Sequence, residues 1–565
     1  MSAITDLGDE YVEGLAALDP IAATSLGIAG HESELTDYSK AGEEAREALA
    51  RNALARLDTL PSEADGDGIA RDVMREALAI DCDLFDTGDY LANLNVLASP
   101  LQSIRRVFDL MPAADEGDWM TLAQRMGRVP GALGGYRATL LRGIEARRIA
   151  PRRQIEACIG QCEAWGAGGD TGGNFFAGIV AGITDCKSEG LLRDLEVAAE
   201  SAATSYRSFA TFLRETYLPW AEDRDAVGED RYQLYARAWN RCALDLRETY
   251  DWGWDELQRI DAEMEAAAEL IAPGAGVEVA KEVLETDPSR AIEGVERFQE
   301  WMQDLQDTTI AELNGTHFDI PEPLQRLEAL IAPPGGALAM YYTGPSEDFS
   351  RPGRTWYPTG GKTRFPLWGE VSIAYHEGVP GHHLERGNTR LLDLSRFQRL
   401  FGDCSGYVEG WGLYAERLMG ELGYLDRPDY ALGLLRSQAL RSVRVVIDIG
   451  MHLELPIPDG QPFHPGERWT PALGNEFALT RSHFPAEFMA SEIDRYLGIP
   501  GQAISYKVGE RAWLAAREAA RSTLGDAFDL RTFHSGMLAL GPMGLGLLER
   551  ESARLGTGDS SEKGR

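Results

Sequence analysis

Three histidines and two glutamates stand close together in the segment His376-Glu377-Gly378-Val379-Pro380-Gly381-His382-His383-Leu384-Glu385. Histidine nitrogens and carboxylate oxygens are ligands that Zn²⁺ binds readily, and many zinc hydrolases use two histidines one helical turn apart with a glutamate between them. In such enzymes the glutamate takes a proton from a water molecule that attacks a carbonyl group. The segment therefore predicts a metal-dependent hydrolase, with His376 as a ligand and Glu377 as the general base.

The second histidine ligand is ambiguous, because the segment departs from the usual spacing. His382 and His383 both follow Pro380-Gly381. On an unbroken helix with 3.6 residues per turn, His383 would share the face of His376 better than His382. However, proline removes a helical hydrogen bond and glycine loosens the turn, so we expect a kink or bulge here. An insertion looped out at the kink would bring His382 to the ligand position, and the spacing leaves both histidines open.

A third ligand is expected from the next helix, which carries acidic residues on one face. On a helical wheel Glu409, Gly412 and Glu416 lie together, and the glycine permits close approach of a neighbouring group. Glu409 would bind the ion, and Glu416 would orient a ligand histidine. The alternative is a solvated acidic face. The opposite face is apolar and aromatic, with Tyr407, Trp411, Tyr414 and Leu418.

A later helix places four polar residues on one face among apolar neighbours, namely Arg441, Arg444, Asp448 and His452. Because burial without partners is costly, this pattern predicts a buried polar network or a cleft wall. An arginine there would hold a substrate carboxylate or neutralise the acids of the site. The alternative is a structural pair of arginine and aspartate.

Further along the chain, Tyr506 follows the segment Pro500-Gly501-Gln502-Ala503-Ile504-Ser505. Its hydroxyl would donate a hydrogen bond to the oxyanion of a tetrahedral intermediate. The alternative is a tyrosine packed in the core at the start of a helix.

The elements that position these residues are predicted to be mainly α-helical. Apolar residues recur at helical spacing up to about residue 270, and we expect one helix there to end or kink at Pro130-Gly131. Another helix is expected to end at Ala332. Residues 336–370 combine aromatic residues with proline and glycine, which favours short strands or loops before the metal helix.

We therefore expect a helical scaffold lobe at residues 1–270, a lobe with the metal site at 271–555 and a disordered tail at 556–565. The two lobes can also form one continuous domain.

Composition limits the classes of partner. The chain has 55 basic and 90 acidic residues and a formal net charge of −35, which repels nucleic-acid phosphates and anionic lipids. No apolar stretch is long enough to span a bilayer, and the N-terminus lacks the features of a secretory signal. Six scattered cysteines do not suggest a disulfide framework. These features favour a cytoplasmic protein that binds neither nucleic acid nor membrane.

Four segments together resemble one bacterial family in the gluzincin clan of zinc peptidases, known as domain of unknown function eight-eight-five (DUF885). The family patterns are similar to His376–His382, to Glu409–Glu416 with Gly412 in place of alanine, to Arg441–His452 and to Pro500–Gly509. The resemblance implies a large helical, zincin-like body with a deep cleft. It also implies a zinc ion held by His376, His382 and Glu409. In the family pattern the first histidine after Pro-Gly is the regular one, which favours His382 over His383.

Together, these features predict a zinc-dependent hydrolase of peptide or other amide bonds, with short peptides as substrates. Glu377 would act as general base, and Tyr506 with His452 would stabilise the oxyanion. Glu416, His383, Arg441, Arg444 and Asp448 would support the ligands or contact the substrate. One alternative is a metal- or peptide-binding helical protein without turnover, and another is a helical scaffold without metal. The oligomeric state is open.

Overall fold

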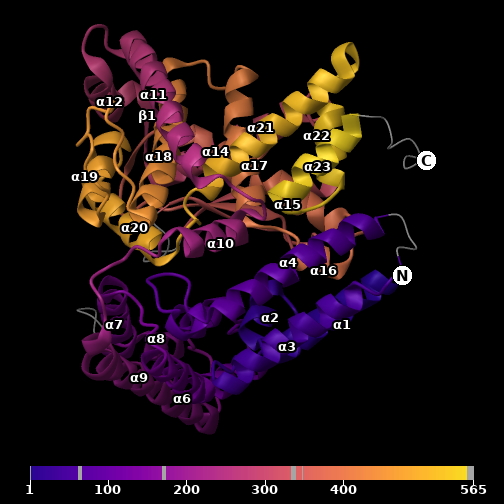
Figure 1. Ribbon diagram of the computed structural model, residues 1–565, viewed down its shortest axis with the longest axis vertical. Coiled ribbons are helices and arrows are strands. Elements are labelled where there is room, and N and C mark those ends of the chain that lie inside the picture. The colour runs from indigo at the N-terminus through magenta and orange to yellow at the C-terminus, as the bar shows by residue number, and fades with distance from the viewer. Residues whose placement is uncertain (1, 62–65, 168–172, 333–338, 347, 557–565) are drawn as a thin grey trace. The chain divides into compact units, whose positions relative to one another are not determined.

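The computed structural model describes residues 2–61, 66–167, 173–332, 339–346 and 348–556 (Figure 1). The chain forms two compact units, one of residues 1–227 with 490–500 and one of residues 228–489 with 501–565. The fold is mainly α-helical with a few short strands, as the sequence predicted. The expected disordered tail falls almost entirely outside the described residues.

The first unit consists of helices whose apolar faces share one core. Its longest helix, α6, continues through Pro130 because this proline is exposed while Val129 and Leu133 beside it are buried. The helix therefore does not end at Pro130-Gly131, and the alternative of a kink there stays a prediction. Helices α6 and α9 lie side by side (Figure 1). The helices of this unit are α1 (Ala3–Leu18), α2 (Pro20–Leu26), α3 (Lys40–Leu57), α4 (Asp67–Thr87), α5 (Pro100–Arg106), α6 (Glu116–Glu145), α7 (Arg152–Ala167), α8 (Phe175–Ala181), α9 (Glu189–Phe212) and most of α20 (Ala486–Gly498).

The second unit contains the segments with candidate chemistry. Its helices are α10 (Glu229–Asn240), α11 (Leu246–Ile271), α12 (Gly276–Thr286), α13 (Val295–Leu313), α14 (Val371–Glu377), α15 (His382–Leu391), α16 (Arg396–Phe401), α17 (Ser405–Glu421), α18 (Pro428–Leu453), α19 (Pro471–Arg481), α21 (Ser505–Leu524), α22 (Leu530–Ala539) and α23 (Leu545–Gly556). Helix α11 packs along α18, and α17 packs along α21. These two pairs form the frame of the unit.

The boundary between the units differs from the division expected at residue 270. Helices α10 and α11 belong to the second unit because they pack on α18. The hydroxyl of Tyr232 on α10 donates to Asp448, and a side chain at Gly253 on α11 would collide with Val445. The apolar periodicity that identified these helices carries no information about which partner covers them.

Three glycines bring α17 and α21 into backbone contact. A Cβ atom on Gly410 would overlap the backbone of Gly509, and one on Gly509 would overlap the carbonyl oxygen of Gly406. Because no side chain fits between the helices at this crossing, Glu409 on α17 and Tyr506 on α21 are held by the same rigid contact.

Short strands precede the metal-site helices, as expected. Strand β4 (Gly353–Tyr357) lies between β2 (Leu327–Ile331), which is parallel to it, and β3 (Tyr341–Thr343), which is antiparallel. A separate antiparallel pair joins β1 (Ala291–Glu293) to β5 (Arg364–Pro366).

Strand β2 replaces the helix that was expected to end at Ala332. Its free edge is covered by α13, where Gln303 donates to the carbonyl of Leu327 and accepts from the backbone N–H of Ala329. Gln299 donates to the Ala329 carbonyl. These side chains form hydrogen bonds with backbone groups at the edge of β2, which would otherwise pair with another strand.

No helix in the described part of the chain is both long enough and apolar enough to cross a bilayer.

Candidate metal centre

The two candidate histidine ligands lie on separate helices joined by a tight turn. Helix α14 ends after His376 and Glu377, and α15 begins at His382. The N–H of Gly381 donates to the carbonyl of Tyr375 at 3.0 Å, and a Cβ at this glycine would overlap the carbonyl oxygens of Tyr375 and His376. Only glycine fits here, and the expected break of the helix is confirmed.

Helix α17 fixes this turn from the side. The indole N–H of Trp411 donates to the carbonyl of Pro380 at 2.9 Å. The same helix carries Glu409, so the element that supplies the carboxylate also holds the backbone between the two histidines.

The candidate ligand atoms converge on one point. Nε2 of His376 lies 3.4 Å from Oε2 of Glu409, and Nε2 of His382 lies 3.7 Å from the same oxygen. The three ligand atoms lie within 4.8 Å of one another. Within the described ranges, no second group of three such side chains comes as close.

These distances fit a zinc ion. Both exceed the usual N–H···O hydrogen-bond length of about 2.7–3.2 Å. They are close to the separation of about 3.3–3.6 Å between two ligands of a tetrahedral ion with bonds of about 2.0–2.2 Å. Two imidazole nitrogens and one carboxylate oxygen are also a common donor set for catalytic zinc.

Glu416 orients the first histidine. Nδ1 of His376 donates to Oε1 of Glu416 at 2.9 Å, and this carboxylate is completely buried. Because Glu416 engages Nδ1–H, Nε2 is the ring nitrogen that faces Glu409, and its lone pair becomes free for a ligand bond when the ring is neutral. Gly412 makes room for the ring, since a Cβ there would lie 2.7 Å from both ring nitrogens of His376. The predicted acidic face of α17 is therefore the face against which the ring of His376 packs.

The charges favour a cation at this point. Burial would raise the pKa of Glu409, but the imidazoles of His376 and His382 hold it well below its usual range. Burial would lower the pKa of His376, yet Glu409 and Glu416 raise it to about 10. Burial lowers the pKa of His382 to about 4. A single positive charge is thus stabilised between His376 and Glu409, where a divalent ion would take the place of a proton.

Glu377 is half-buried beside His376 at the end of α14. Burial raises the pKa of Glu377 to about 7, while the charges of His376 and Arg441 oppose the rise. A carboxyl group with a pKa near neutrality suits proton transfer in both directions.

His383 has a different role. Its Nε2 donates to the carbonyl of Leu324 at 3.0 Å, and its Nδ1 accepts from the hydroxyl of Tyr342 at 3.1 Å. Both ring nitrogens are engaged, which leaves His382 as the histidine that faces Glu409. His383 ties α15 to strand β3, and Gly353 of β4 lies so close that a Cβ would overlap the ring.

The comparison with known proteins supports the resemblance to DUF885 and does not test the link to the gluzincin clan. A family model described as "Bacterial protein of unknown function (DUF885)" matches residues 20–551. The chain belongs to this family.

Two solved structures have a fold similar to that of this chain. A "putative lipoprotein" from Colwellia psychrerythraea has a TM-score of 0.85 at 22% identity, covering 98% of this chain and 99% of that chain. A "putative lipoprotein of unknown function" from Shewanella oneidensis has a TM-score of 0.76 at 15% identity, covering 98% of this chain and 100% of that chain. A comparison with curated proteins gave no match.

Two further DUF885 segments meet beside the ligands. Arg441 on α18 lies 4.0 Å from Oε1 of Glu416 and donates to Ser437. The guanidinium groups of Arg441 and Arg444 lie 5.7 Å and 4.7 Å from the ring centre of Tyr506. Tyr506 thus contacts the metal-site network through Arg441.

Asp448 and His452 form a different, fully buried cluster on α18. Oδ2 of Asp448 accepts from the Tyr232 hydroxyl at 2.8 Å and from the N–H of Gly501 at 3.0 Å. Nε2 of His452 lies 3.7 Å from Oδ1 of Asp448, and its ring packs 5.5 Å from that of Tyr232. These contacts support a structural role for both residues and give no support to His452 as an oxyanion donor.

The sequence interpretation missed several residues of this region. Trp411 was placed in the aromatic core stripe, and its indole N–H also holds the metal-site turn. Tyr342 and Leu324 engage His383, but their positions in the chain gave no signal for this. Glu385 on α15 is buried and burial raises its pKa to about 7.

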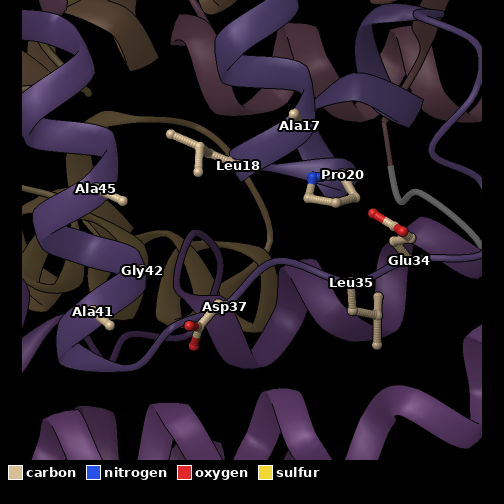
Figure 2. Close-up of a pocket in the computed structure, with 9 residues that line it drawn as sticks. All are labelled: Ala17, Leu18, Pro20, Glu34, Leu35, Asp37, Ala41, Gly42 and Ala45. Carbon is tan, nitrogen blue, oxygen red and sulfur yellow. The ribbon is translucent and has the colours of Figure 1, made fainter.

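A pocket in the first unit carries no such chemistry. Figure 2 shows Ala41 and Ala45 of α3 on one side of it and Pro20 with Glu34 on the other. The pocket measures about 240 Å³, and Asp37 in its wall accepts hydrogen bonds from Ser39. Its lining consists of Ala17, Leu18, Pro20, Glu34, Leu35, Asp37, Ala41, Gly42 and Ala45.

Proposed function

We propose that this DUF885 protein is a zinc-dependent hydrolase of peptide or other amide bonds that acts on short peptides. The observation that carries the proposal is the convergence of His376, His382 and Glu409 with a half-buried glutamate beside them. The resemblance to gluzincin zinc peptidases, with Glu377 directly after the first histidine, supports the same chemistry.

His376, His382 and Glu409 would hold the metal. Bound there, Zn²⁺ would act as a Lewis acid and lower the pKa of water toward neutrality. Glu416 leaves Nε2 of His376 free for this bond by accepting a hydrogen bond from Nδ1–H. Gly412 and Trp411 hold the ring and the turn in place.

Glu377 would carry the proton during hydrolysis. It would accept a proton from the attacking water and deliver it to the leaving amine, for which a pKa near neutrality is suitable. Tyr506 is the proposed donor to the oxyanion, and a donor of this kind contributes about 3–4 kcal/mol to transition-state stabilisation.

The test uses a Glu377→Gln variant, which removes the base and keeps the shape of the side chain. We expect metal-loaded Glu377→Gln to bind one zinc ion per chain and to lose at least about 100-fold of the peptidase activity. Activity that survives this change unaltered would exclude Glu377 as the base.

Two other functions are distinguished by the same preparation. A protein that binds one zinc ion and a peptide without cleaving it would be a binding protein. Zinc far below one ion per chain after metal supplementation would favour a helical scaffold, and an anomalous-scattering map at the zinc edge would locate the ion. A cytoplasmic location without nucleic-acid or membrane partners stays a prediction, and both structural neighbours are called putative lipoproteins.

A further inference from the structure

Arg441 is a buried arginine whose hydrogen-bonding capacity is incompletely used. Its relative exposure is 9%, and Nη1 donates to the carbonyl and hydroxyl of Ser437 one turn earlier on α18. Nε has no hydrogen-bond partner among the described residues. Leaving a charged donor unsatisfied in a buried place is costly, so such a group calls for an explanation.

The nearby acid does not explain Arg441. Oε1 of Glu416 is 4.0 Å from Nη2, which is too long for a hydrogen bond, and this oxygen already accepts from His376 at 2.9 Å. The Glu416 side chain is fully buried, whereas the Arg441 side chain keeps 11% exposure. Nη2 is therefore the part of the guanidinium that remains available to a ligand, since Nε is buried as well as unpaired.

The surroundings hold the guanidinium of Arg441 in place. The guanidinium lies over the ring of Tyr506, and Arg444 lies over the same ring at 4.7 Å. Ser437 fixes the other side of the group. A guanidinium that is held at Nη1 presents the N–H donors of Nη2, which can form a charge-assisted hydrogen bond to a carboxylate oxygen.

Arg441 is also close to the reacting groups. One carboxylate and one imidazole separate it from the ligand nitrogen of His376, with contacts of 4.0 Å and 2.9 Å. One or two extended peptide residues, at roughly 3.5 Å each, can bridge from the guanidinium of Arg441 to a carbonyl group beside the ligand nitrogen of His376.

We propose that Arg441 is the specificity-determining residue that binds the free C-terminal carboxylate of a short peptide. The substrate would be cleaved one or two residues before its C-terminus. This inference rests on the proposed hydrolase function and adds the end of the peptide that is recognised. Arg444 and Tyr506 would position the guanidinium.

The test compares tripeptides that have a free C-terminus with the same tripeptides as C-terminal amides. Binding is measured by calorimetry to the zinc-loaded Glu377→Gln protein, so that no cleavage interferes. We expect the free acids to bind about 10- to 100-fold more tightly than the amides, the range of a charge-assisted hydrogen-bonded pair. Arg441→Met is expected to abolish this difference, and Arg441→Lys to retain only part of it.

Arg386 provides a matched control. It lies on α15, about one helical turn after His382. Its side chain is 44% exposed and pairs with Asp403 at 3.4 Å. Arg386→Met removes the same charge near the site and should leave the preference for free acids intact. Equal zinc content and equal melting temperatures verify that each variant folds.

Each outcome separates the two proposals. Equal binding of acids and amides to the Glu377→Gln protein overturns the assignment of Arg441, as does a preference that survives Arg441→Met or disappears with Arg386→Met. If the unmodified enzyme cleaves acids and amides at equal rates, the hydrolase proposal stands and the carboxylate site fails. If it cleaves neither but the binding preference follows Arg441, the carboxylate site stands and the hydrolase proposal fails.

Discussion

Gly412 offers a sharp test of the metal centre, because a single added methyl group would meet the ring of His376. A Cβ at this position would lie 2.7 Å from Nδ1 and from Nε2 of His376. Carbon and nitrogen atoms in ordinary contact are about 3.5 Å apart, and Cε1 of the ring lies nearer to the added Cβ than the nitrogens do, so the ring must move by at least about 0.8 Å in Gly412→Ala. A shift of this size changes both the 2.9 Å bond to Glu416 and the 3.4 Å separation from Glu409.

The expected result is a loss of zinc affinity with little loss of helix stability. Disturbing a ligand histidine and its supporting carboxylate lowers metal affinity by about 10- to 100-fold. In the metal-free protein, overpacking costs about 1–3 kcal/mol, and the higher helix propensity of alanine offsets about 1 kcal/mol of this. The zinc dissociation constant is measured by competition with a chromophoric chelator, and the free energy of unfolding by urea titration.

Gly420 in the same helix supplies the control. A Cβ at Gly420 would lie 3.4 Å from a methyl group of Leu434, which is close to an ordinary contact. Gly420→Ala should therefore leave zinc affinity unchanged. Zinc binding by Gly412→Ala that equals that of the unmodified protein would refute the placement of His376 in the ligand set.

Two further predictions concern the metal-free protein. Burial raises the pKa of Glu385 in the folded state to about 7, above its unfolded value, so its contribution to the free energy of unfolding falls as pH rises from about 4.5 to 7. Glu385→Gln should weaken this fall, as measured by urea unfolding at pH 5 and pH 7.5, and an unchanged pH dependence would contradict the buried carboxyl. Removal of zinc by a chelator should lower the melting temperature, because a ligand at 1,000 times its dissociation constant stabilises the fold by about 4 kcal/mol. A melting temperature that does not depend on added zinc would count against a site formed in the folded protein.

Helix periodicity was sufficient to predict the face of α17. Its buried aromatic residues lie on one face and the acids Glu409 and Glu416 on another, with the regular period of a helix, so the wheel placed Glu409, Gly412 and Glu416 together. The structure adds what fills the space over Gly412, which is the ring of His376.

The wheel could not choose between His382 and His383, because the helix is interrupted between α14 and α15. The contacts that distinguish them come from distant parts of the chain. Leu324 and Tyr342 engage His383 from 59 and 41 residues away. The family resemblance indicated His382, but no property of the local segment did.

Strand β2 and helix α6 were mispredicted for opposite reasons. The sequence Leu327–Ile331 has residues that suit a helix, yet pairing with β4 and the hydrogen bonds of Gln303 hold it as a strand. At Pro130, a residue that normally ends a helix is tolerated because buried neighbours on the same helix anchor both sides of it. In both places tertiary contacts outweigh local propensity.

The glycine crossing of α17 and α21 limits how this protein can be modified. Because Gly406, Gly410 and Gly509 leave no gap between the two backbones, larger residues there would drive apart the segments that carry Glu409 and Tyr506. Engineering of this protein should therefore leave these three glycines unchanged, because any larger residue at the crossing shifts both helices at once.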